Sequence, residues 1–314
     1  GVTGSAGKTT VKNMLDSVLR SLGNVLATPA NMNNEIGLPM TLFNLSPKTK
    51  AVVLEMGAGK RGDISYLAKI AEPNLGVITM CSPAHLTGFG TVDTIAETKG
   101  ELISALPHDG VAILNADDRY FEYWRSLAGS RKTLTFGSKG DFYSEAEELG
   151  ENSSSFSLGL DNRTSRVIIR YLGRHNITNA LAASAAAYEV GVSISDITSS
   201  LAICSPTKGR LYQMKGKNRL NILDDTYNAN PSALLAALDV LKKKVGEKWV
   251  VMGDMKELGR LSDKYHFEAG KQMKDAGVDR LFTVGEKGAQ IGSGFQGLTE
   301  HFTDNENLIT RILE

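Results

Sequence analysis

Residues 1–10 read Gly1-Val2-Thr3-Gly4-Ser5-Ala6-Gly7-Lys8-Thr9-Thr10, a glycine-rich loop that runs directly into an apolar-periodic segment. This pattern is typical of a phosphate-binding loop. Its glycines let backbone N–H groups face inward, and the helix that follows directs the positive end of its dipole at the anion. A lysine, here Lys8, contacts phosphate oxygens, and the hydroxyl of Thr9 reaches a magnesium ion. We therefore predict a nucleoside triphosphate site and a helix over residues 8–22. The predicted nucleotide contacts are Gly4, Ser5, Ala6, Gly7, Lys8, Thr9 and Thr10.

The loop departs from the strict consensus, which has a glycine five positions before Gly7, where this chain has Val2. The alternative is a glycine-rich turn before an ordinary helix, but Gly-Lys-Thr-Thr at a helix start favours the phosphate site. Such a loop normally follows a buried strand. Because nothing precedes Gly1, we expect the first strand of the domain to be missing. Residues 307–314 are typical of a helix that stops before a further strand, which leaves a C-terminal truncation open.

The amino-acid composition limits the classes of protein to which the chain can belong. The chain has 314 residues, of which 41% are hydrophobic, enough for two domains with separate cores. Lysine plus arginine and aspartate plus glutamate both number 35, so no net charge favours nucleic acid or an anionic membrane. The two cysteines, Cys81 and Cys204, suit neither a disulfide framework nor a metal site. No apolar run approaches the roughly 18 residues of a membrane span. We expect a cytoplasmic protein.

Short apolar runs predict buried parallel strands at residues 51–57, 76–80 and 111–114. Ligands of open α/β sheets bind beyond the carboxyl ends of the strands, so Glu55 is a candidate magnesium ligand, or else a solvated strand-end acid. His85 follows the second run and is either a ligand or a structural histidine. Lys99 lies in a helix predicted over residues 92–105, where the pattern alone indicates a surface lysine.

Asparagines mark two further segments. Asn33 and Asn34 belong to a polar stretch over residues 31–39, which is either a binding loop or a capping and turn segment. Asn176 and Asn179 share one face near the start of an alanine-rich helix that runs to about residue 190. They either cap this helix or contact a nucleotide base.

The strand–helix alternation predicts two α/β domains, 1–205 and 206–314. The first contains a small antiparallel addition over residues 141–171. The second has a parallel sheet with strands at residues 220–223, 249–252 and 281–284. Polar loops follow the first two of these strands, and Lys208 or Arg210 near the boundary is available to phosphates.

Taken together, these stretches resemble the Mur ligase family of ATP-dependent enzymes that build the peptide stem of peptidoglycan. The resemblance rests on residues 1–9, Leu54-Glu55-Met56-Gly57, Ala84-His85-Leu86, Leu114-Asn115-Ala116-Asp117-Asp118, the helix start Gly173 to Ala180, and Lys208-Gly209-Arg210. Residues 33–39, 224–231 and 252–259 are most similar to the branch of the family that adds D-alanyl-D-alanine. Met80 and Cys81-Ser82-Pro83 depart from the pattern of many relatives, which puts the geometry of the His85 loop in question.

The resemblance implies an α/β fold with a central P-loop ATPase domain, whose sheet is mostly parallel, followed by a C-terminal Rossmann-like domain. It also implies an N-terminal UDP-binding domain that this chain lacks. The implied catalytic residues are Lys8, Lys99, His85 and Arg210, and the implied metal ligands are Thr9, Glu55, His85 and Lys99 as a carbamate. Asn115, Asn176, Asn179, Arg210 and Asp225 would contact ATP, and Asn33, Asn34, Tyr227, Asn228 and Asn230 the substrates.

By the same resemblance, the chain would use ATP and Mg2+ to join D-alanyl-D-alanine to UDP-N-acetylmuramoyl-tripeptide (UDP-MurNAc-tripeptide) through an acyl phosphate, as a monomer. Two alternatives remain: another amide ligase of the superfamily, such as one for a different amino acid or a folylpolyglutamate synthase, and a nucleotide-binding partner subunit without catalysis.

Overall fold

The computed structural model describes residues 1–314, apart from the side chain of Asn218. The chain forms two compact units. The first comprises Gly1–Ser82 and Thr91–Thr207, and the second comprises Pro83–Gly90 and Lys208–Glu314. The short segment 83–90, which contains His85, thus belongs to the second unit although residues of the first unit flank it on both sides. No pattern in the sequence indicates this interruption. No helix among the described residues is long and apolar enough to cross a membrane.

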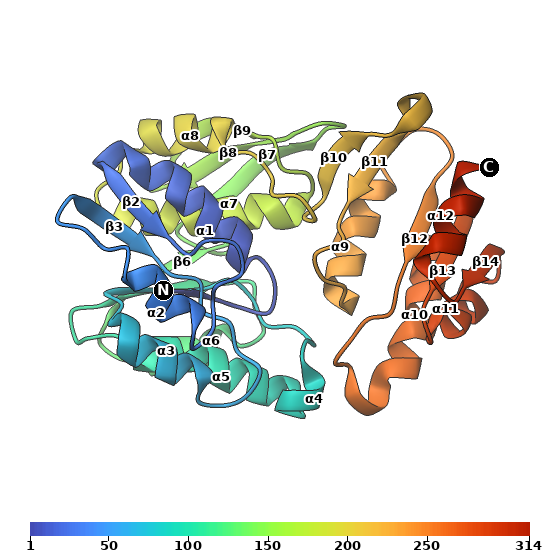
Figure 1. The fold of residues 1–314 in the computed structure, drawn as a ribbon. Coiled ribbons are helices and arrows are strands. Elements are labelled where there is room, and N and C mark those ends of the chain that lie inside the picture. Colours follow the sequence, from blue (N-terminus) through green and yellow to red (C-terminus); the bar gives the residue numbers. More distant parts are fainter. The chain divides into compact units, whose positions relative to one another are not determined.

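The first unit is built on a parallel sheet (Figure 1). Its hydrogen-bonded order is β1 (Val2–Thr3), β4 (Leu75–Ile78), β5 (Val111–Asn115) and β6 (Lys132–Phe136). The parallel pair β2 (Asn24–Ala27) and β3 (Thr49–Val53) continues this sheet through a bridge between Val2 and Glu55. This confirms the predicted α/β class with a mostly parallel sheet. It also places the carboxyl ends of β1, β3, β4 and β5 along one edge.

Strand β1 differs from the expectation that the strand before the loop lies upstream of Gly1. Val2 and Thr3 themselves form this strand, in register with Val77 and Ile78 of β4. Val2 is 1% exposed, and its N–H donates to Leu54 O over 2.8 Å. Residues assigned to the loop from sequence therefore lie in the centre of the sheet.

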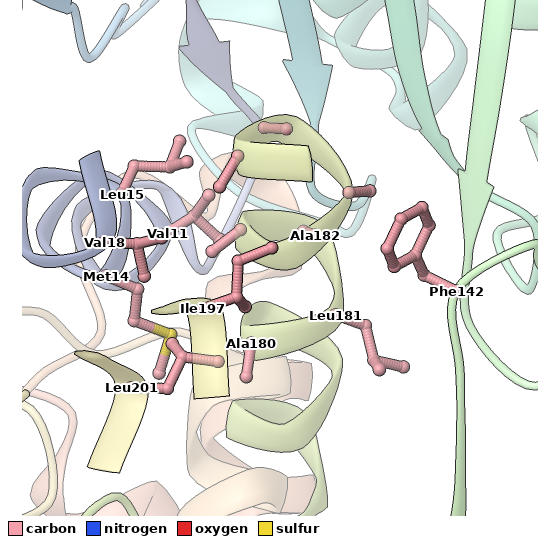
Figure 2. Close-up of a cluster of buried hydrophobic side chains, with 14 of the residues drawn as sticks. Val11, Met14, Leu15, Val18, Phe142, Ala180, Leu181, Ala182, Ile197 and Leu201 are labelled. Carbon is pink, nitrogen blue, oxygen red and sulfur yellow. The ribbon is translucent and has the colours of Figure 1, made fainter. Parts of the chain in front are cut away.

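Helices cover both faces of this sheet. On one face lie α1 (Lys8–Leu19), α7 (Arg174–Glu189) and α8 (Ile194–Ile203), and on the other lie α3 (Asp63–Ala71), α5 (Val92–Ser104) and α6 (Phe121–Ala128) (Figure 1). Figure 2 shows Val11, Met14 and Val18 of α1 meeting Ile197 and Leu201 of α8 beside the alanines of α7. Alanine has a high helix propensity and a small side chain, so α7 forms readily and lets its neighbours approach closely.

The predicted antiparallel addition is confirmed. It consists of β7 (Tyr143–Leu149), β8 (Ser154–Leu160) and β9 (Arg163–Ile169), paired in that order. Phe142, Phe156 and Val167 of this region are at most 1% exposed and belong to the same core as α1 and α7. The addition therefore packs as part of the first unit.

The second unit contains a parallel sheet of β12 (Trp249–Met252), β13 (Arg280–Val284) and β14 (Leu298–Phe302). Its helices are α4 (Leu86–Phe89), α9 (Pro231–Leu241), α10 (Ser262–Asp275), α11 (Gly288–Phe295) and α12 (Asn305–Leu313). One detail of the sequence prediction is wrong. The strand expected at residues 220–223 is β11 (Asn221–Asp224), and it pairs antiparallel with β10 (Tyr212–Lys215) instead of joining the parallel sheet.

The backbones of helices α10 and α11 approach each other closely at two glycines. A Cβ on Gly270 or Gly294 would overlap the backbone carbonyl oxygen of Ile291 or Phe267. Only glycine fits at such contacts. Gly294 lowers the intrinsic helix propensity of α11, but it allows α11 to pack against α10.

Candidate functional site

The glycine-rich loop is held against the segment that follows strand β4. Ser5 N donates to Met80 O over 2.9 Å, and Ser5 Oγ donates to Ser82 O over 3.0 Å. Thr79 Oγ1 donates to Ala6 O over 2.5 Å. The loop is therefore already shaped before any anion binds, so little ordering entropy opposes binding. Lys8 Nζ donates to Gly4 O over 2.8 Å, which keeps the amine within its own loop.

Two glycines make this shape possible. Gly4 has φ +149° and Gly7 has φ +84°, values that L side chains rarely adopt. A Cβ on Gly4 would overlap Thr79 Oγ1, and a Cβ on Gly7 would overlap Asn179 Oδ1. Gly7 is also the residue directly before α1, where backbone N–H groups have no partner within the helix. These are the donors that a phosphate would use.

Asn176 and Asn179 support the loop and do not cap their own helix. Asn179 Nδ2 donates to Asn176 Oδ1 over 3.0 Å, and Asn176 Nδ2 donates to Leu172 O over 2.8 Å. Gly173 precedes the helix without a side-chain cap. Both asparagines are less than 10% exposed, so this chain of amides fixes Asn179 Oδ1 next to Gly7.

Glu55 follows shortly after the end of β3, and it is 1% exposed. Its Oε1 accepts from Asn33 Nδ2 over 2.7 Å, and its N–H donates to Thr28 Oγ1 over 2.9 Å. Its other oxygen, Oε2, is buried without a hydrogen-bond partner among the described residues. A buried carboxylate oxygen without a partner is costly, and a cation would relieve that cost. This excludes the solvated strand-end acid that the sequence left open.

The donor set fits magnesium. Among the described residues, no group of three or more His, Cys, Asp or Glu side chains could hold a metal ion by itself. Mg²⁺ usually takes only one or two carboxylates and completes its shell with water and substrate phosphates. Glu55 Oε2 and the hydroxyl of Thr9 suit this pattern, since both flank the phosphate loop at the edge formed by β1 and β3.

Lys99 lies on α5 and is 3% exposed, so the surface position suggested by its sequence pattern is wrong. Burial, together with the positive charge of Lys8, lowers the pKa of Lys99 to about 7. A substantial fraction of the amine is thus neutral near pH 7. A neutral amine is the form that reacts with carbon dioxide to give a carbamate.

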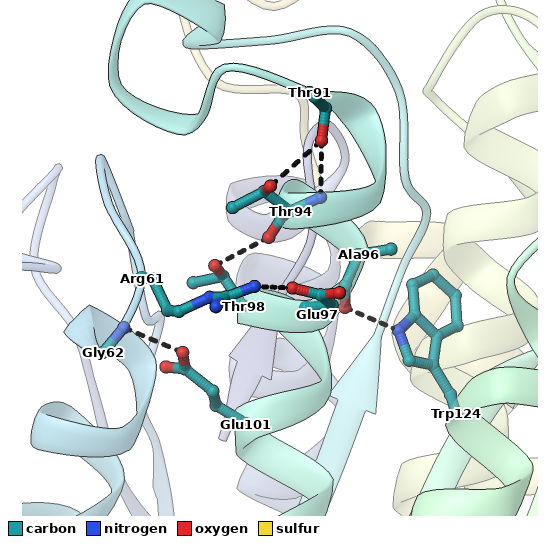
Figure 3. Close-up of polar contacts among 9 residues, drawn as sticks. All are labelled: Arg61, Gly62, Thr91, Thr94, Ala96, Glu97, Thr98, Glu101 and Trp124. Atoms are coloured by element: carbon teal, nitrogen blue, oxygen red, sulfur yellow. Dashed lines mark hydrogen bonds and ion pairs between the residues drawn. The ribbon is translucent and has the colours of Figure 1, made fainter.

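Helix α5 is anchored firmly around Lys99 (Figure 3). Thr91 caps its start by accepting from Thr94 N over 3.1 Å, and Glu101 accepts from Gly62 N over 2.8 Å. On the opposite side, Trp124 Nε1 donates to Ala96 O over 2.9 Å. These contacts tie α5 to α3 and α6 and fix the position of the lysine.

Asn115 ends β5 and is 8% exposed. Its Nδ2 donates to Thr79 O over 3.0 Å, and its Oδ1 accepts from Asp117 N over 3.0 Å. Asn115 thus joins the exits of β4 and β5 near the phosphate loop. Asp118 accepts from Cys81 N over 2.7 Å and fixes the segment that contains the unusual Cys81. Burial raises the pKa of the Cys81 thiol to about 12, so this cysteine stays protonated.

His85 lies in the second unit, where its Nδ1 contacts the carboxylate of Glu257. Thr87 N also donates to Glu257 O over 3.2 Å. A carboxylate on one ring nitrogen is the usual arrangement of metal-binding histidines, because it orients the ring and raises the basicity of the other nitrogen. The structure therefore leaves Nε2 as the atom of His85 suited to a metal. Sequence reasoning missed Glu257, whose spacing from His85 gave no signal.

Arg210, Asp225 and Tyr227 lie together in the second unit. The guanidinium carbon of Arg210 is 3.9 Å from the centre of the Tyr227 ring, a cation–π contact. Asp225 Oδ1 accepts from Leu211 N over 3.1 Å, and burial raises the pKa of this carboxyl. Gly209, with φ +77°, lets Tyr227 N approach Gly209 O to 3.2 Å.

Several predicted substrate residues have structural roles. Asn230 Oδ1 accepts from Ala233 N over 2.9 Å and caps α9, and Asn34 Oδ1 accepts from Gly37 N over 2.9 Å at the start of α2 (Gly37–Leu42). Asn228 is exposed. Sequence reasoning also missed His266, a fully buried residue whose Nε2 accepts from Met255 N over 2.9 Å. It fixes the loop that contains Glu257.

Two cavities of the first unit lie elsewhere. One, of about 610 Å³, lies between α6 and β6 and includes Arg119, Arg125 and Asp141. The other, of about 1000 Å³, lies between α3 and α5 and includes Arg61, Glu97 and Tyr123. Neither is lined by a predicted site residue.

Comparisons with known proteins agree with this geometry. Residues 2–187 match the Mur ligase middle domain, and residues 209–314 match the Mur ligase glutamate ligase domain. The chain is 38% identical over 314 residues to the UDP-N-acetylmuramoyl-tripeptide–D-alanyl-D-alanine ligase of Escherichia coli, covering 99% of this chain and 69% of that protein. It is 37% identical to the enzyme of the same name from Haemophilus influenzae, with 98% and 68% covered.

Solved structures give the same result. A crystal structure of MurF from Acinetobacter baumannii superimposes with a TM-score of 0.95 at 35% identity, covering 99% of this chain and 68% of that one. MurF ligase from Thermotoga maritima in complex with ADP matches with a TM-score of 0.86 at 31% identity, covering 100% and 72%. With both family domains matched in order over most of its length, the chain belongs to the Mur ligase family.

Proposed function

We propose that this chain performs ATP-dependent ligation of D-alanyl-D-alanine to UDP-N-acetylmuramoyl-tripeptide in peptidoglycan precursor synthesis. The observation that carries the proposal is the preformed phosphate loop beside Glu55, whose Oε2 is buried without a partner. The relatives named for this reaction support the choice of substrates. We also propose that the protein acts as a monomer in the cytoplasm, where its two buried cysteines would stay reduced.

The reaction transfers the γ-phosphoryl group of ATP to the carboxylate of the tripeptide. The amine of D-alanyl-D-alanine then attacks the acyl phosphate, and phosphate leaves as the amide forms. The backbone N–H groups at Gly7 and the start of α1 would bind the phosphates, and Lys8 would offset charge that develops on the transferred group. Because Thr79 and Asn179 already fix the loop, these donors need little rearrangement during the reaction.

The remaining predicted residues complete the site in this proposal. Thr9 and Glu55 would hold one magnesium ion. His85 through Nε2, and Lys99 as a carbamate, would each serve as a magnesium ligand. Bound magnesium would supply positive charge that stabilises the phosphoryl group as it moves. Asn115, Asn176 and Asn179 would contact ATP toward its adenine end, and Arg210 and Asp225 are also proposed as ATP contacts.

The decisive experiment measures ADP and phosphate release with UDP-MurNAc-tripeptide, with D-alanyl-D-alanine, diaminopimelate, lysine or glutamate as the amine. Release that depends on D-alanyl-D-alanine, with the amide product detected by mass spectrometry, is the expected result. Release with a different amine would assign the chain to a sister ligase. ATP binding without any phosphoryl transfer would instead favour a nucleotide-binding subunit. A Lys8→Ala variant serves as the matched inactive control.

A further inference from the structure

The side chain of Asn33 is hydrogen-bonded to the carboxylate of Glu55. Its Nδ2 donates to Glu55 Oε1 over 2.7 Å, across a separation of 22 positions in the chain. The carboxylate is 1% exposed, and its Oε2 has no partner among the described residues. The amide thus satisfies one oxygen of the carboxylate and leaves the other.

The orientation of Asn33 is fixed by its surroundings. Gly57 N donates to Asn33 O over 2.8 Å, and Asn33 N donates to Asn31 O over 2.8 Å. A Cβ on Gly57 would lie only 2.7 Å from Asn33 Oδ1, so the absence of a side chain at Gly57 gives the amide its space. An amide held this way by its backbone and neighbours loses little entropy in keeping Glu55 oriented.

A buried cation lies near the same carboxylate. Lys12 is 5% exposed, and its Nζ donates to Thr28 O over 2.8 Å. Thr28 Oγ1 in turn accepts from Glu55 N over 2.9 Å. Burial lowers the pKa of Lys12, and the charges of Glu55 and Asp16 oppose that lowering. Lys12 and Glu55 are therefore linked through Thr28 and by the attraction between their charges.

We propose that Asn33 is a positioning residue that occupies Glu55 Oε1, so that Glu55 offers Oε2 alone as the ligand of a divalent cation. This inference rests on the proposed function, in which Glu55 binds the magnesium of ATP. The resemblance to the Mur ligase family implied that Asn33 contacts a substrate. In this proposal, Asn33 instead supports the metal ligand.

The test measures Mn²⁺ affinity by electron paramagnetic resonance, with Mn²⁺ alone and with ATP, on the whole chain. The variants are Asn33→Ala, Asn33→Ser, Glu55→Gln and the double variant Asn33→Ala with Glu55→Gln. Asn31→Ala, an exposed asparagine of the same loop, is the control. Thermal unfolding establishes that each variant is folded.

We expect Asn33→Ala to weaken Mn²⁺ binding about 10- to 100-fold, the usual effect of removing a partner of a metal ligand. Asn33→Ser, which keeps a smaller donor, should fall between that variant and the wild type. Asn31→Ala should bind normally. In the Glu55→Gln background, Asn33→Ala should cause no further loss, because both changes act through one ligand. The KM for UDP-MurNAc-tripeptide should stay unchanged in Asn33→Ser.

Two outcomes would overturn the inference in different ways. If Glu55→Gln loses Mn²⁺ while Asn33→Ala binds it normally and raises the KM for UDP-MurNAc-tripeptide, Asn33 contacts the substrate, and the proposed function stands. If the wild type binds neither Mn²⁺ nor ATP, the proposed function fails together with the inference.

Discussion

The amide oxygen of Asn179 lies against Gly7 so closely that no Cβ would fit between them. This contact joins the phosphate loop to α7, a helix that begins more than 160 positions later in the chain. The loop conformation thus depends on tertiary packing as well as on its own glycines.

Replacing Gly7 by alanine should abolish ATP binding. The change forces a residue with a side chain to keep φ +84° and also drives its Cβ into Asn179. The left-handed conformation alone costs about 1–2 kcal/mol. Gly191→Ala is the matched control, because Gly191 has φ +92° with nothing within 4 Å of its Cβ. Isothermal titration with ATP and urea unfolding should show that Gly191→Ala loses only stability. Equal ATP affinity in both variants would contradict the role of the contact.

The modification of Lys99 should depend on pH. Because burial lowers the pKa of Lys99 to about 7, the amine is mostly protonated below pH 7 and mostly neutral above it. Only the neutral amine forms a carbamate, so ¹³C-labelled bicarbonate should give a carbamate NMR signal at pH 8 that fades below pH 7. Lys99→Met should lack the signal, and Lys69→Met, at an exposed position, should keep it. A signal absent at pH 8 from the folded wild type would count against the carbamate.

Glu257 should matter to catalysis through His85. Glu257→Gln keeps the shape of the side chain but removes the charge that orients and polarises the imidazole. We expect kcat to fall about 10- to 100-fold, with a higher Mg²⁺ requirement and little change in the melting temperature. Glu268→Gln, which removes only a surface partner of Lys264, is the control. A Glu257→Gln enzyme with normal Mg²⁺ dependence would rule out this role.

Trp124 should be a strong determinant of stability around α5. The residue is fully buried, and Trp124→Phe removes the indole N–H that donates to Ala96 O, a carbonyl inside α5. The lost hydrogen bond costs about 0.5–1.5 kcal/mol, in addition to the cost of the space left by the indole. The neighbouring exposed Tyr123 gives the control Tyr123→Phe, expected to stay within about 0.5 kcal/mol. Urea unfolding monitored by circular dichroism measures both.

Much of the first unit could be predicted from the sequence, because its central strands β4 and β5 are continuous apolar runs. Residues 76–80 and 111–114 correspond to β4 and β5 with small changes at the ends. The second unit was harder to predict. Three successive polar residues separate Leu298 from Phe302 in β14, and α11 contains several glycines, so neither element has a strong local signal. Both depend on packing against neighbouring elements, which no local pattern reports.

The residues of the candidate site also differ in how well the sequence predicts them. The role of Gly4 and Gly7 could be predicted from the sequence, because their backbone angles need glycine. The burial of Lys99 and the pairing of His85 with Glu257 involve residues far apart in the chain. A periodic pattern in α5 therefore indicated an exposed lysine, and only the packed structure corrects it.

The interruption formed by residues 83–90 bears on how the protein can be dissected. A fragment that starts at Lys208 would carry Glu257 but not His85 and Thr87, its partners within the same unit. Such a fragment would be an incomplete folding unit, even though its sequence limits look like those of an independent domain. Adding a synthetic peptide of residues 83–90 would be the direct way to restore the missing piece.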